Sequence, residues 1–211
     1  MKDLLNPGQT EAEKEFPSLS RREGVVPDEV WHWIVAAKAD VVLNPKSAHA
    51  LLRVSNDGKS LYQSSPSSPP RVLMAETYLK CICVSSKVLP STRVYLELRV
   101  TRSVPWTVGF RTASFDADNN YDCSPAAGIW TIASVDGKIL INAGKAIPTD
   151  YTTPARLGLY LDYRLGQLSF YDAVAKLHLF TYVANFKEQL LIYASVETGI
   201  ELVPDAFITL I

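Results

Sequence analysis

A regular series of short strand-like segments, separated by turns, runs from residue 40 to the end of this chain. In the clearest one, 93–101, apolar side chains occupy every second position from Val94 to Val100. This alternation is typical of a strand with one buried face and one face in water. It predicts that Tyr95 and Glu97, which lie between the apolar positions, belong to the wet face.

Two pairs of these segments are joined by turns that favour hairpins. Segments 130–135 and 138–141 flank Asp136-Gly137, a dipeptide typical of a two-residue hairpin turn. Segments 157–162 and 167–171 flank a second, four-residue turn. Further strand-like segments lie at 178–182, 190–195 and 207–211. Many short strands at regular spacing predict an all-β fold, a two-sheet antiparallel β-sandwich.

The residues before the strands divide into a polar leader and a short helix. Residues 1–26 are rich in Glu, Ser, Arg and Pro, so we expect a flexible leader or the remnant of a linker. Pro27 and the two acidic residues after it favour a helix start, and a short N-terminal helix is predicted over 27–38. Three residues form its apolar face: Trp31, Ile34 and Val35. This face should dock the helix on the rest of one domain, which spans 27–211 and includes the helix.

Length and charge exclude several classes of function. A chain of 211 residues suits one well-buried domain. Its net charge of −1 creates no field that attracts nucleic acid. No apolar run approaches the roughly 20 residues of a membrane-spanning helix, so membrane insertion is not expected. Three cysteines, without a signal peptide before them, favour a reducing compartment, and we expect a cytoplasmic protein.

The sequence contains no recognisable motif of an active site. It has no Gly-x-Ser-x-Gly elbow, no Cys beside a plausible His and no glycine-rich phosphate loop. Asp116, Asp118 and Asp122 share one segment, but the Gly and Glu of a calcium loop are absent. Cys81 and Cys83 lack the paired partners that zinc requires. We therefore predict no catalytic residue, no cofactor and no metal, and a protein that is not an enzyme.

Several phrases, taken in order, resemble the PRY-SPRY domain. They are Leu43-Asn44-Pro45, Tyr95-Leu96-Glu97-Leu98, Trp106-Thr107-Val108-Gly109-Phe110, Leu161-Asp162-Tyr163 and Ser169-Phe170-Tyr171. That domain is the C-terminal recognition module of tripartite-motif ubiquitin ligases and the intracellular module of butyrophilins. The resemblance implies a β-sandwich with a PRY part at 39–63 and a SPRY part at 71–211. It also implies protein binding in innate-immune or ubiquitin-pathway targeting.

The chain departs from the family pattern at positions that bear on packing. Leu96 stands where the family usually has Trp, Thr92 where it has Gly, and Arg164 where it has an acidic residue. The smaller Leu96 removes aromatic volume from the core, so we expect neighbouring side chains to refill the space.

In this family, loops at one end of the sandwich bind the partner. Mapped onto this chain, these loops are 56–59, 101–105, 112–127, 133–137 and 194–200. The predicted partner-binding residues are Asn56, Asp57, Arg102, Phe115, Asp116, Asn119, Tyr121, Ala133, Val135, Asp136 and Glu197. Phe115 and Tyr121 are aromatic residues among polar ones, as in recognition loops. The alternative is that Phe115 packs into the core, where we also expect Trp106 and Trp130.

A second function remains open from the sequence. Some butyrophilin domains bind small phosphorylated ligands in a basic pocket on this fold. Arg99, Arg102 and Arg156 could supply such a pocket here, although no basic motif of that kind is intact. The prediction is therefore protein recognition, with a small anionic ligand as the alternative.

Overall fold

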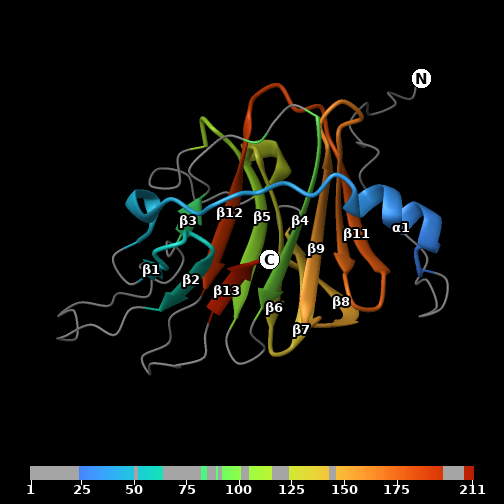
Figure 1. The fold of residues 1–211 in the computed structure, drawn as a ribbon, viewed down its shortest axis with the longest axis horizontal. Coiled ribbons are helices and arrows are strands. Elements are labelled where there is room, and N and C mark those ends of the chain that lie inside the picture. Colours follow the sequence, from blue (N-terminus) through green and yellow to red (C-terminus); the bar gives the residue numbers. More distant parts are fainter. Residues whose placement is uncertain are drawn as a thin grey trace, which may run out of the picture.

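The computed structural model of the chain describes residues 24–49, 52–63, 82–84, 89, 92–100, 105–115, 124–142, 146–196 and 207–211. In these residues the strands form two antiparallel sheets that face each other, and one α-helix lies on the outer face of the larger sheet (Figure 1). The predicted class, an all-β sandwich with a short N-terminal helix, is confirmed.

The larger sheet has the strand order β1-β2-β13-β4-β9-β10-β11. Its strands are β1 (Leu52–Val54), β2 (Ser60–Gln63), β13 (Phe207–Leu210), β4 (Arg93–Val100), β9 (Arg156–Asp162), β10 (Gln167–Asp172) and β11 (Leu177–Val183). The C-terminal strand β13 therefore lies between β2 and β4, and it joins the early strands to the rest of the sheet.

The smaller sheet has the strand order β3-β12-β5-β6-β7-β8. Its strands are β3 (Ile82–Val84), β12 (Leu190–Val196), β5 (Trp106–Thr112), β6 (Ile129–Val135), β7 (Lys138–Asn142) and β8 (Ala146–Thr152). Two short 3-10 helices, η2 (Pro45–Ser47) and η4 (Pro125–Ala127), precede β1 and β6.

Both predicted hairpins are present. The β6–β7 turn has positive φ at Asp136 (50°) and Gly137 (74°). Positive φ at both central residues is the turn geometry whose twist matches that of the flanking strands. In the β9–β10 turn, Asp162 accepts hydrogen bonds from the backbone N–H groups of Arg164 and Leu165. These side-chain bonds satisfy the donors of the turn and hold it closed.

The inner faces of the two sheets form one apolar core. On β4, the alternating residues from Val94 to Val100 all point into it, as the pattern predicts. Trp106 and Trp130 are both buried in the same core, so their predicted placement is confirmed.

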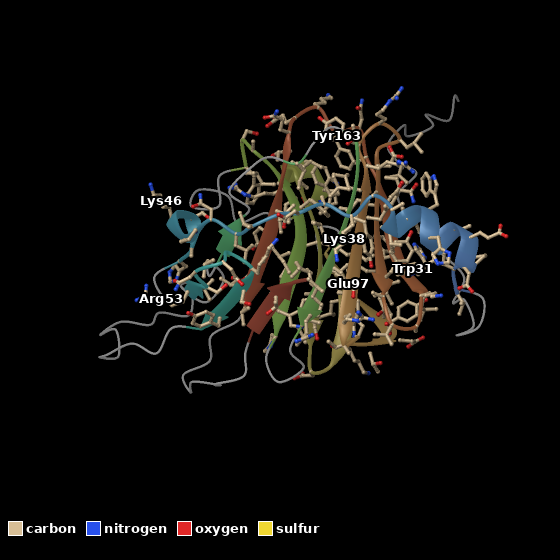
Figure 2. All side chains as sticks on the ribbon, viewed as in Figure 1. Trp31, Lys38, Lys46, Arg53, Glu97 and Tyr163 are labelled. Carbon is tan, nitrogen blue, oxygen red and sulfur yellow. The ribbon has the colours of Figure 1, made fainter. Side chains whose placement is uncertain are left out.

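Helix α1 (Asp28–Val35) covers part of the outer face of the larger sheet. Its Trp31 points at the strands (Figure 2) and meets the rings of Tyr95 and Tyr171 edge-on, at centroid distances of 5.9 and 5.6 Å. The prediction that Tyr95 faces water is therefore wrong, because the helix covers it and only 1% of its surface is exposed. The alternating pattern showed which face Tyr95 is on, but not that another element covers that face.

The helix ends three residues earlier than predicted because the chain turns to pair with β4. The backbone N–H of Tyr95 donates to the Ala37 carbonyl (2.7 Å), and the Ala39 N–H donates to the Tyr95 carbonyl (3.0 Å). Upstream of the helix, Val25 already pairs with Leu177 of β11. The chain thus contacts the sheet before residue 27, and the division at 26/27 stays a prediction.

Candidate functional site

Strand register divides the predicted loops between opposite ends of the sandwich. Val196 of β12 pairs with Trp106 of β5, which pairs with Ser134 of β6. The last residues of β6 and β12 and the first residue of β5 therefore lie at one end of this sheet, which we call the β6–β7 end. At the other end of the same strands, Leu190 pairs with Thr112 and Arg111 pairs with Ile129. The 112–127 segment thus begins and ends far from the β6–β7 turn, and the expectation of one shared end is corrected.

Phe115 lies at that opposite end and its side chain is buried. It packs against Ile129 of β6 and Tyr193 of β12, and only 6% of its surface is exposed. The guanidinium of Arg111 lies 5.9 Å from the Phe115 ring and donates a hydrogen bond to the Phe115 carbonyl. The structure therefore favours the alternative placement, in which Phe115 is packed in the interior.

Asn56 and Asp57 are exposed and lie in the β1–β2 turn. The Asp57 carboxylate accepts hydrogen bonds from the Ser55 hydroxyl and from the Lys59 backbone N–H. These bonds, led by the one from Ser55, lower the pKa of Asp57 because they favour its ionised form. The carboxylate is thus engaged in holding its own turn.

Three of the predicted residues come together at the β6–β7 end. Ala133 is buried in β6, whereas Val135 is 38% exposed and Asp136 is exposed at the turn. The turn is braced by a hydrogen bond from the Thr153 N–H to the Gly137 carbonyl (2.8 Å) and by one between the Ser134 and Thr153 hydroxyls. Five predicted residues lie outside the described part of the chain: Arg102, Asp116, Asn119, Tyr121 and Glu197.

The alternative basic pocket does not form from the arginines whose positions the structure gives. Arg99 and Arg156 are cross-strand neighbours on β4 and β9. However, the Arg156 guanidinium is paired with the Glu97 carboxylate at 2.8 Å. Glu97 neutralises one of the two cations, and Arg102, the third, lies outside the described residues.

Sequence reasoning missed an aromatic–cation surface beside α1. The Arg93 guanidinium lies 4.2 Å from the centroid of the Trp33 ring, and Trp33 also contacts the ring of Tyr160 at 5.7 Å. Trp33 is 49% exposed. The helical spacing could have indicated this surface, because it places Trp33 outside the buried face that carries Trp31 and Ile34.

Burial shifts the pKa values of several side chains on the outer face of the larger sheet. Desolvation raises the pKa values of Tyr95, Tyr160 and Tyr171 beneath α1. It lowers the pKa of His178, whose ring nitrogen lies 2.7 Å from the Thr181 hydroxyl. These groups lie in a packed cluster, with His178 edge-on to the Tyr171 ring at 5.6 Å. A packed position of this kind is structural in character.

The residues that the structure describes form neither a metal-binding group nor a membrane-spanning helix. Among them, no group of three or more His, Cys, Asp or Glu side chains is placed to hold a metal ion. Likewise, no helix in this part of the chain is long and apolar enough to cross a membrane. Of the cysteines, Cys83 lies in β3, while Cys81 and Cys123 fall outside the described residues.

A two-sheet sandwich that presents braced turns at its ends is the architecture of a loop-bearing binding domain. The SPRY domain family matches residues 93–204, more than half of the chain. The chain therefore belongs to the SPRY domain family, as its sequence phrases indicated.

Curated relatives carry this domain within longer proteins. E3 ubiquitin-protein ligase TRIM69 of Rattus norvegicus is 29% identical over 194 residues, which cover 83% of this chain and 36% of that protein. Tripartite motif-containing protein 72 of Rattus norvegicus is 31% identical over 157 residues, 72% of this chain and 33% of that protein. The chain thus spans about a third of the length of these two relatives.

Solved structures show the same fold. The TRIM65 PSpry domain superposes with a TM-score of 0.67 at 17% identity, covering 87% of this chain and 98% of that one. Stonustoxin superposes with a TM-score of 0.62 at 18% identity, covering 84% of this chain and 29% of its own.

Proposed function

We propose that this domain is a non-catalytic module that recognises a partner protein, in the cytoplasm and in ubiquitin-pathway or innate-immune targeting. Its membership of the SPRY family and its similarity to a protein named as an E3 ubiquitin ligase support this role. The packed environment of His178 supports the non-catalytic part, since its ring is engaged by Thr181 and Tyr171.

The observation that carries the proposal is the pair of exposed residues on the braced β6–β7 turn. Val135 presents apolar surface, and Asp136 presents a carboxylate at a fixed positive-φ position. Because the Thr153 contacts hold this turn in place, little conformational entropy is lost when a partner binds it. An apolar contact beside an orienting charge is suited to a small, specific interface.

A matched pair of surface variants tests this assignment. Val135→Asp should abolish capture of a cellular partner by the immobilised domain, because it places a charge in the apolar contact. Leu165→Asp is the control, since Leu165 is 71% exposed in the β9–β10 turn at the opposite end. Partners would be identified by cross-linking and mass spectrometry, and their affinities then measured with purified protein.

Asp136→Asn provides a milder second variant. It removes the charge but keeps a residue that tolerates positive φ, so the turn should persist. A partner bound by the parent should bind this variant more weakly, with stronger salt dependence in the parent than in the variant. If Leu165→Asp alone removed the partner, the binding surface would belong at the other end.

A further inference from the structure

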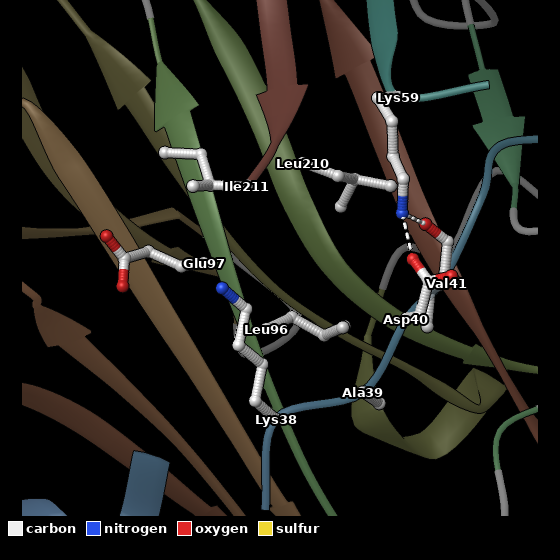
Figure 3. A pocket seen from close by; sticks show the side chains of 9 residues that line it. All are labelled: Lys38, Ala39, Asp40, Val41, Lys59, Leu96, Glu97, Leu210 and Ile211. Atoms are coloured by element: carbon white, nitrogen blue, oxygen red, sulfur yellow. Dashed lines mark hydrogen bonds and ion pairs between the residues drawn. The ribbon is translucent and has the colours of Figure 1, made fainter. Parts of the chain in front are cut away.

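A cavity of about 480 Å³ opens where two segments along the same edge of β4 separate. The segment after α1 pairs with β4 at Tyr95, and Ile211 donates its N–H to the carbonyl of Glu97 (2.8 Å). Between these two contacts, the chain from Ala39 to Val41 turns away from the strand. Figure 3 shows the resulting space between this segment and the end of β13.

The walls of the cavity combine apolar side chains with a few charges. Leu96 and Leu210, only 3% and 6% exposed, form the part nearest the core, and Ile211, 42% exposed, lies at its side. Space of this size holds on the order of fifteen water molecules at ~30 Å³ each. A concave site with mostly apolar walls and a few polar groups is the usual form of a small-molecule pocket.

Most of the charges around the cavity are already paired. Lys59 contacts the Asp40 carboxylate and donates to the Val41 carbonyl (2.7 Å). Glu97 is paired with Arg156 at 2.8 Å, and Figure 3 shows its carboxylate turned away from the space. Lys38 is different: it is an exposed side chain at the rim of the cavity, and its ammonium forms no ion pair with any residue that the structure describes.

We propose that this cavity binds a carboxylate carried on an aliphatic body. The carboxylate would pair with Lys38, and the aliphatic part would lie against Leu96, Leu210 and Ile211. An anion is favoured over a cation because Asp40 and Glu97 each have a cationic partner already, whereas Lys38 has none among the described residues. The ligand could be a free fatty acid or the C-terminal leucine of a peptide, which share this chemistry. The site is separate from the β6–β7 turn and does not depend on its role.

Titration of the full chain with hexanoate, followed by nuclear magnetic resonance, tests the proposal. Saturable shifts are expected for Leu96, Leu210 and Ile211, and hexanol should produce weaker ones because it lacks the charge. Lys38→Gln should weaken hexanoate binding by about tenfold or more, the loss expected for one charge-assisted contact. Lys38→Arg should retain it.

Lys46→Gln is the matched control. Lys46 is exposed in η2, and Figure 2 shows it well separated from Lys38. The Lys46→Gln variant should bind hexanoate as tightly as the parent protein does. The proposal is overturned if hexanoate gives no saturable shifts at these three residues, or if Lys38→Gln binds as well as the parent.

Two further probes distinguish the sources of the carboxylate. N-acetyl-leucine binding more tightly than hexanoate, and N-acetyl-leucinamide not binding, would identify a peptide C-terminus. Octanoate binding most tightly would identify a free fatty acid. Equal binding of N-acetyl-leucine and its amide would show that the charge is irrelevant, and would refute the role of Lys38.

Discussion

Gly109 of β5 lies directly against Trp130 of β6, so closely that a Cβ atom at Gly109 would collide with the Trp130 carbonyl oxygen. The same Cβ would lie 2.7 Å from the Cα of Thr131. Both obstacles are backbone atoms of a paired strand, so neither can move without breaking the ladder. Gly109→Ala should therefore destabilise the domain by about 3 kcal/mol or more, measured by chemical denaturation.

Gly158 on β9 provides the comparison. A Cβ there would lie 2.9 Å from the Tyr95 hydroxyl, which is a side-chain atom with some freedom to shift. Gly158→Ala should cost less, about 1–2 kcal/mol. Equal losses in the two variants would contradict the argument from backbone collision.

The two tryptophans of α1 should differ sharply in their contribution to stability. Trp31 is buried between Tyr95 and Tyr171, so Trp31→Ala should lower the free energy of unfolding by about 3–5 kcal/mol. Trp33 is half exposed and mainly contacts Arg93 and Tyr160, so Trp33→Ala should cost about 1 kcal/mol or less. Urea denaturation of both variants measures the difference. A larger loss for Trp33 would mean that the helix docks through its other face.

The tyrosines beneath α1 should make the domain sensitive to alkali. Their folded-state pKa values are raised above the ordinary value of about 10, so the unfolded chain loses these protons first as pH increases. The free energy of unfolding should then fall as pH rises above about 10. Tyr95→Phe should reduce this decline, measured by denaturation between pH 8 and pH 11, relative to the parent. A parent whose stability is constant over that range would contradict the prediction.

His178 should make the domain sensitive to acid, whereas the tyrosines make it sensitive to alkali. Burial lowers its pKa in the folded state, so the unfolded chain binds a proton more readily. The stability that depends on neutral His178 is present above the ordinary pKa of about 6.5 and is lost as pH falls below it. His178→Gln should flatten the pH dependence between about pH 6.5 and 5 in thermal melts. An unchanged slope in the variant would assign the acid sensitivity to other groups.

Much of the fold could be predicted from the sequence, because the periodicity of strands depends on local pattern. The alternation from Val94 to Val100 and the Asp136-Gly137 turn identified elements that the structure contains. The burial of Tyr95 could not be predicted from the sequence, since it depends on where α1 packs on the sheet. The site was harder still: the sequence order of the loops does not show that Phe115 and Val135 lie at opposite ends, which only strand register reveals.

Leu96 packs in the core between the two sheets and is only 3% exposed. That neighbouring side chains have refilled the space beside this smaller residue stays a prediction. On that basis Leu96→Trp should overpack the core and lower the free energy of unfolding by about 1–3 kcal/mol. A variant more stable than the parent in chemical denaturation would show instead that the site is under-filled.

The position of β13 between β2 and β4 also affects how the domain can form during synthesis. A ribosome adds residues from the N-terminus, so β1, β2 and β4 emerge long before Phe207–Leu210. Until then β2 has no partner on its inner edge, and β4 lacks the strand that its last residues pair with. The nascent chain must keep two strand edges unpaired through more than a hundred residues of elongation. Such edges can pair with other chains, so this order of synthesis predicts a need for chaperones while the domain is being made.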